Sequence, residues 1–70
     1  MADSIQITVN GETRLIQGQA TVAELLSVLS LDTRKVAVER NLEIVPRSAY
    51  AATALAPGDS LEIVHFIGGG

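Results

Sequence analysis

Apolar and polar side chains alternate from residue 5 to residue 9, which is the period of a strand with one buried face. The dipeptide Asn10-Gly11 follows, and it favours a two-residue hairpin because both residues accept positive φ. A returning strand is predicted over residues 12–16, with Leu15 or Ile16 making most of its apolar contact. The amino-terminal pattern therefore predicts a β-hairpin.

The spacing of apolar residues changes after Gly18. Thr21 and Glu24 form the T-x-x-E pattern of a capping box, in which each side chain satisfies an amide of the first helical turn. Apolar residues then recur at i, i+3, i+4 and i+7, and they are Val22, Leu25, Leu26 and Leu29. Leu31 is expected to close the end. This pattern predicts one amphipathic helix whose apolar stripe faces a core.

Two short β-prone runs follow the predicted helix. The first is residues 36–38, a run that stops at Asn41, and the second is residues 44–45, which Pro46 ends. Between residues 47 and 55 the side chains are small or polar around Tyr50. This stretch predicts an irregular turn or a short helix that the tyrosine ring holds down.

The last part of the chain predicts a turn at Pro57-Gly58-Asp59 and a final strand over residues 61–67. A single amphipathic helix can bury its stripe only against the apolar face of a sheet. If the last strand lies in the middle beside the first, the two are parallel and the helix lies in the crossover between them. We therefore expect residues 1–70 to form a single α+β domain with the β-grasp (ubiquitin-like) fold, a mixed sheet packed on one main helix.

Length and composition narrow the class of protein. Seventy residues suffice for one domain, and with 47% hydrophobic residues but only two aromatic ones the core must be aliphatic. The chain has no cysteine, so no disulfide can hold the fold and no side-chain thiol can carry sulfur. We expect a cytoplasmic protein, because a signal peptide and an apolar run of about 20 residues are both missing.

The formal charge of −3 indicates the kind of partner. A negatively charged surface repels phosphate backbones, so nucleic acid is not expected as a partner. Acidic side chains can instead steer a positively charged partner protein, or they can form no more than a solvated surface. The candidate steering residues are Glu39, Glu43, Asp59 and Glu62.

Three glycines end the chain, Gly68, Gly69 and Gly70. A tail without side chains passes through a narrow tunnel, because glycine accepts backbone conformations that are closed to other residues. Such a tail can bring its own terminal carboxylate into an active site. The carboxylate becomes an electrophile only after a partner converts it to an acyl phosphate such as an acyl adenylate, which a sulfur nucleophile can then attack. The alternative is a frayed end without a role.

Six sequence segments form a pattern when taken together. They are VNG at 9–11, TVAELL at 21–26, VAVERN at 36–41, IVPRS at 44–48, PGD at 57–59 and EIVHFIGGG at 62–70. The most specific part is the succession of VERN, IVPR and EIVHF-x-GGG. Over nearly its whole length the chain resembles the ThiS family of sulfur carriers in thiamin (thiazole) biosynthesis.

The resemblance implies a β-grasp fold and ATP-dependent adenylation of Gly70 by an activating enzyme, followed by conversion to a thiocarboxylate. It also implies cysteine as the sulfur source, through a cysteine desulfurase, and thiazole synthase as the sulfur acceptor. By the same analogy Gly69 and Gly70 form the reactive tail, and Gly68 lengthens it. The chain would then be a carrier that enzymes act on, with two covalent states and no bound cofactor.

The predicted last strand also presents a candidate partner-binding face, because alternate side chains of a strand point to opposite faces. The expected partner-binding residues are Glu62, Val64, Phe66 and Ile67. Val64 and Phe66 would form an apolar docking patch, and Ile67 would anchor the tail in a partner groove. The alternative is that Tyr50 or the helix covers Phe66.

His65 and Arg47 invite other roles. His65 lies near the tail, but no accompanying nucleophile or carboxylate makes it a catalytic base, so we expect a spacer. Arg47 is expected to pair with Glu39 or Glu43, or to contact a partner. A single histidine among scattered carboxylates predicts no metal site.

Three other functions stay open on the sequence alone. The small subunit of molybdopterin synthase shares the fold and the diglycine end, although the VERN and IVPRS segments look more like the thiamin branch. A ubiquitin-like modifier conjugated to lysines would use the same tail. A non-covalent ubiquitin-like binding module would leave the tail idle.

Overall fold

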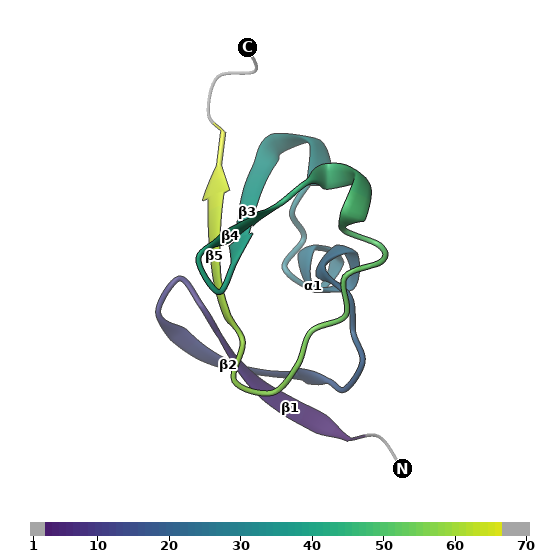
Figure 1. Cartoon of the computed structure of the whole chain (residues 1–70), viewed down its shortest axis with the longest axis vertical. Coiled ribbons are helices and arrows are strands. Elements are labelled where there is room, and N and C mark those ends of the chain that lie inside the picture. Colours follow the sequence, from purple (N-terminus) through teal and green to yellow (C-terminus); the bar gives the residue numbers. More distant parts are fainter. Residues whose placement is uncertain (1–2, 67–70) are drawn as a thin grey trace.

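The computed structural model describes residues 3–66, in which one α-helix packs against a five-stranded sheet (Figure 1). The strands are β1 (Ser4–Val9), β2 (Glu12–Gln17), β3 (Val36–Arg40), β4 (Glu43–Val45) and β5 (Ser60–His65), and the helix is α1 (Val22–Val28). The order across the sheet is β2-β1-β5-β3-β4, with β1 and β5 parallel and the other neighbours antiparallel. This is the β-grasp arrangement, so the predicted fold class is confirmed.

The first hairpin forms where the sequence predicts it. Asn10 and Gly11 have φ of 51° and 83°, the left-handed conformation that a tight two-residue turn requires. β1 and β2 pair in register from Ser4 with Gln17 to Val9 with Glu12. The returning strand buries Ile16 and leaves Leu15 71% exposed, which decides between the two expected contacts.

Helix α1 begins with the predicted capping box. The Thr21 hydroxyl accepts a hydrogen bond from the Glu24 amide at 3.2 Å, and the Glu24 carboxylate accepts one from the Thr21 amide at 2.8 Å. The apolar stripe of the helix lies on the sheet, with Val22, Leu25 and Leu26 buried. The predicted amphipathic helix is therefore confirmed.

Apart from Tyr50 the core is aliphatic, and it lies between α1 and one face of the sheet. Its buried residues are Ile7, Val9, Ile16, Ala20, Val22, Leu25, Leu26, Val36, Val38, Val45, Tyr50, Leu55, Leu61 and Ile63. Tyr50 follows the 3-10 turn Arg47–Ala49, and its hydroxyl donates to the Val36 carbonyl at 3.5 Å. The predicted short helix, held in place by the tyrosine ring, is present.

The later strands follow the prediction in part. β3 ends at Arg40, directly before Asn41, where the sequence predicts that the run stops, and its backbone pairs with both β4 and β5 up to that point. β5 ends at His65, so the predicted end at Ile67 is wrong. Phe66 still donates its amide to the Lys35 carbonyl at 2.7 Å. Ile67 lies outside the described residues.

Candidate functional site

β5 is the element that leads to the proposed reactive tail, and it lies in the centre of the sheet between β1 and β3 (Figure 1). Its pairing with β1 is short, from Thr8 with Ser60 to Val9 with Leu61. Its pairing with β3 is longer and reaches His65. The predicted tail residues Gly68, Gly69 and Gly70 lie outside the described residues.

The side chain of Asn10 extends the short contact between β1 and β5. Its Nδ2 donates to the Ile63 carbonyl at 3.2 Å, and its Oδ1 accepts from the Ile63 amide at 2.7 Å. Its backbone amide also donates to the Leu61 carbonyl at 2.8 Å. Asn10 thus satisfies backbone groups of β5 at a point where β1 has already ended.

Asn41 has the equivalent role on the other side of β5. Its φ is also 51°, its Oδ1 accepts from the Ser60 amide at 3.0 Å, and its backbone amide donates to the Ser60 carbonyl at 2.8 Å. Asn10 and Asn41 each occupy a left-handed turn position next to β5. Two turn asparagines therefore fix the start and the middle of this strand.

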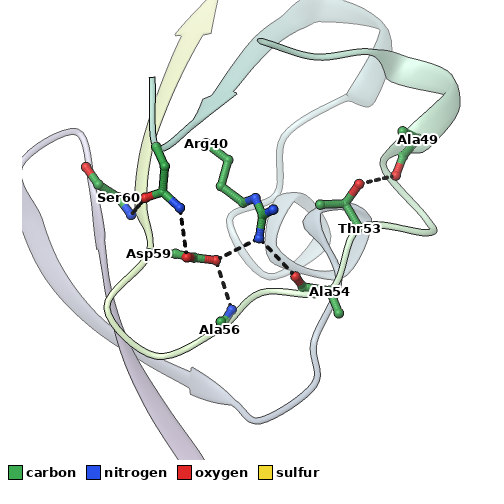
Figure 2. A network of polar contacts seen from close by, with 8 residues as sticks. Arg40, Ala49, Thr53, Ala54, Ala56, Asp59 and Ser60 are labelled. Carbon is green, nitrogen blue, oxygen red and sulfur yellow. Dashed lines mark hydrogen bonds and ion pairs between the residues drawn. The ribbon is translucent and has the colours of Figure 1, made fainter. Parts of the chain in front are cut away.

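Asp59 lies directly before β5 at the centre of a polar network (Figure 2). Its carboxylate accepts hydrogen bonds from the Ala56 amide at 2.9 Å, the Asn41 side chain at 3.0 Å and the Arg40 guanidinium at 3.2 Å. Burial raises the pKa of the Asp59 carboxyl, but these hydrogen bonds and the charge of Arg40 outweigh it and hold the pKa below its ordinary value of 3.8.

The network corrects one prediction about partner steering. Asp59 is only 6% exposed and its charge is compensated by Arg40, so it does not belong to an acidic surface that attracts a partner. Glu39, Glu43 and Glu62 are at least partly exposed, and partner steering by them stays a prediction. The network fastens the Pro57-Gly58 turn to the end of β3.

The outward face of β5 carries the predicted partner-binding residues that the structure describes. Leu61 and Ile63 are buried, so Glu62 and Val64 point away from α1. Val64 is 60% exposed, and Phe66 is 52% exposed, which rules out the alternative in which Tyr50 or the helix covers that ring. Ile67, the fourth predicted residue, lies outside the described residues.

β4 adds an apolar side chain to this face that the sequence reasoning missed. Ile44 is 68% exposed and lies opposite Glu39, which in turn lies opposite Glu62. The strand period could have shown this, because Val45 is buried and its neighbour must point outward. The outward face of β5, β3 and β4 therefore contains Ile44 and Val64 together with Glu39 and Glu62.

Arg47 and His65 have the following environments. The expected pairing of Arg47 with Glu39 or Glu43 is wrong, because Arg47 donates instead to the Arg34 carbonyl at 3.4 Å. His65 is exposed at the end of β5.

Between residues 3 and 66 no group of three or more His, Asp and Glu side chains is placed to hold a metal ion. No helix in that range has the length and apolar character needed to cross a membrane.

Known proteins similar to this chain agree with this architecture. The thiamine biosynthesis protein ThiS of Geobacter metallireducens has a crystal structure that matches with a TM-score of 0.79 and 39% identity, covering 94% of this chain and 100% of that one. The sulfur carrier protein ThiS of Bacillus subtilis is 44% identical over 50 residues, which are 71% of this chain and 76% of that protein.

A longer relative is the thiazole synthase of Paramagnetospirillum magneticum, which is 58% identical over 66 residues. The match covers 94% of this chain but 20% of that protein, so the chain spans about a fifth of the length of this relative. The sequence model of the ThiS family matches residues 7–70. On this match, which includes the central strand and the glycine end, the chain belongs to the ThiS family.

Proposed function

We propose that this chain is a sulfur carrier of thiamin biosynthesis and that the carboxylate of Gly70 carries the sulfur. The observation that supports this most is the family match over residues 7–70, which includes the three terminal glycines. The chain acts as a carrier that enzymes modify, not as a catalyst. We place it in the cytoplasm, where the absence of cysteine fits a reducing environment.

The chemistry takes place at one carbon atom. A carboxylate oxygen of Gly70 attacks the α-phosphorus of ATP within an adenylating enzyme, pyrophosphate leaves, and an acyl adenylate forms. A cysteine desulfurase transfers sulfur from cysteine as a persulfide, whose terminal sulfur attacks the carbonyl carbon, and AMP leaves with the electron pair of the broken C–O bond. A thiol reductant then cleaves the S–S bond of the resulting acyl disulfide, which releases the thiocarboxylate and leaves a disulfide.

Thiazole synthase is the proposed acceptor of this sulfur. The relatives from Paramagnetospirillum magneticum and Magnetococcus marinus that carry this name contain a segment similar to 94% of this chain. A carrier segment within the same polypeptide as its acceptor is held close to it, which raises the effective concentration of the pair. In this chain, the docking contact is assigned to Glu62, Val64, Phe66 and Ile67.

Mass spectrometry tests the proposal. The chain is incubated with ATP, an adenylating enzyme and a sulfur source, and the expected result is the replacement of one oxygen by sulfur at Gly70. A variant that lacks Gly69 and Gly70 is the control and should gain no sulfur. A lysine isopeptide would support a ubiquitin-like modifier instead, and an unchanged wild-type mass would overturn the carrier function.

The molybdopterin branch is distinguished by the acceptor. The purified thiocarboxylate form is offered separately to thiazole synthase and to the large subunit of molybdopterin synthase. Loss of sulfur to thiazole synthase alone is the expected result. Transfer only to the molybdopterin enzyme would move the chain to that pathway.

A further inference from the structure

Two carboxylates lie directly opposite each other on the outward face of the sheet. Glu39 of β3 is paired with Glu62 of β5, and the neighbouring pair Val38 and Ile63 is buried, so both glutamates point away from α1. Side chains at directly opposite positions have Cβ atoms about 4.5–5.5 Å apart. Like charges at directly opposite positions destabilise a sheet.

No basic side chain compensates this pair within the described part of the chain. The ion pairs among residues 3–66 join Arg34 with Asp32 and Arg40 with Asp59. Arg40 is adjacent to Glu39 in sequence, but its guanidinium lies 3.2 Å from the Asp59 carboxylate. Lys35 lies in the 3-10 turn before β3, where its carbonyl accepts from the Phe66 amide, and its side chain is in neither of these ion pairs.

The two carboxylates lie among exposed apolar side chains. Ile44 is opposite Glu39 on β4, and Val64 follows Glu62 by two positions on the same face of β5. A protein that covers Ile44 and Val64 therefore also covers the glutamates and removes them from water. Burial of a carboxylate without a compensating charge is strongly unfavourable, and two adjacent carboxylates increase the cost.

We infer that this face binds a protein surface in which an arginine or lysine side chain lies between apolar residues and bridges Glu39 and Glu62. Arginine fits best, because its planar guanidinium can donate to two carboxylates at once. The inference rests on the proposed function, which supplies thiazole synthase as the occupant. It adds Glu39 and Ile44 to the docking surface and specifies the charge of the partner.

Neutralising either glutamate should raise the stability of the fold and weaken partner binding. Glu39→Gln or Glu62→Gln removes the repulsion between the two strands, so the melting temperature should rise by about 1–4 °C. The same substitutions leave the partner's cation without a counter-charge, so the dissociation constant for thiazole synthase should rise at least about tenfold. If either glutamate had a purely structural role, its substitution would instead lower the melting temperature.

Calorimetric titration of the full chain against its thiazole synthase, at two salt concentrations, tests the inference. Each glutamine variant should bind more weakly and with a smaller salt dependence than wild type. Glu12→Gln, which makes the same charge change on edge strand β2, is the matched control and should bind like wild type. Glu39→Lys should raise the melting temperature further and abolish binding, because it creates an ion pair with Glu62.

The outcomes separate the inference from the proposed function. If wild type binds and the glutamine variants bind equally well, the cation-bridged contact is wrong, whereas sulfur loading of Gly70 is unaffected. If wild type does not bind thiazole synthase, this occupant is wrong. If wild type gains no sulfur in the mass-spectrometric assay, the proposed function fails whatever the variants bind.

Discussion

The side-chain amide of Asn10 forms two hydrogen bonds with the backbone of Ile63, a residue 53 positions away in sequence. The side-chain amide replaces a backbone residue of β1. It offers β5 one donor and one acceptor, as the peptide group of a strand residue would. The parallel contact between the first and last strands therefore continues beyond Leu61 without further backbone pairing. The strand that leads to Gly70 is held at its middle by this contact.

Asn10→Gly should lower the free energy of unfolding by about 2 kcal/mol, because it leaves two backbone groups of Ile63 without partners. Glycine accepts the φ of 51°, so backbone strain does not contribute to the loss. Urea denaturation measures the effect. Asn10→Asp keeps the acceptor for the Ile63 amide and should lose less, and equal stability of all three proteins would show that the contact contributes nothing.

Leu42 is a site where the fold can be stabilised. It has φ of 71° and is 89% exposed at the turn between β3 and β4, so a branched side chain occupies a conformation that favours glycine. The free energy of unfolding of Leu42→Gly should be about 1 kcal/mol higher than that of Leu42→Ala. The alanine variant is the control, because it removes most of the exposed side chain but keeps a Cβ atom at this left-handed backbone position. A glycine variant no more stable than the alanine variant would contradict the strain.

Asp59 predicts how stability depends on pH. Its pKa in the folded state lies below 3.8, so its carboxylate stabilises the fold at higher pH, and that contribution is lost as pH falls through the lowered value. At pH 7, Asp59→Asn should lose about 2 kcal/mol, because it replaces an acceptor of the buried network with a donor. Thermal unfolding of both proteins between pH 7 and pH 2 should show the difference narrowing only below about pH 4. A constant difference would contradict the role of the charge.

Val64→Asp should abolish docking while the fold remains intact, because Val64 is largely exposed beside the glutamate pair. The added carboxylate increases both the polarity and the negative charge of the proposed contact. Leu15→Asp is the matched control, since Leu15 is an exposed apolar residue on edge strand β2. Sulfur transfer to thiazole synthase and circular dichroism are measured for both. Retained transfer in the Val64 variant would remove this face from the docking surface.

Removal of Gly69 and Gly70 should leave the melting temperature nearly unchanged and abolish sulfur transfer. The buried core consists of residues between Ile7 and Ile63, so none of its side chains is removed. Thermal unfolding and the mass-spectrometric assay are run on the same preparation. A large loss of stability would show that the glycine end has a structural role.

Local signals in the sequence predicted much of the fold. The Asn10-Gly11 turn and the Thr21–Glu24 capping box each depend on neighbouring residues, so a single sequence is enough to find them. The period of β5 likewise predicted which of its side chains point outward. Leu15 and Ile16 could also have been separated in advance, because the two-residue turn fixes the register of the hairpin and places Ile16 opposite Ile5 on the buried face.

Long-range contacts could not be predicted in the same way. The local sequence predicts only that Asp59 lies in a turn. Its burial depends on contacts with Arg40 and Asn41, which are 19 and 18 positions away in sequence. The pairing of Glu39 with Glu62 also needs the register of β3 on β5, which no local pattern specifies. The chemistry assigned to Gly70 comes from the family match and stays a proposal.

The central place of β5 has a mechanical consequence for any enzyme that draws the glycine end into a tunnel. A pull on the carboxyl terminus acts along β5, which is hydrogen-bonded on both flanks, to β1 and Asn10 on one side and to β3 and Asn41 on the other. The load is then shared by many bonds stressed in shear at once, instead of opening one after another as at a sheet edge. The domain should therefore resist unfolding when an enzyme pulls on its glycine end.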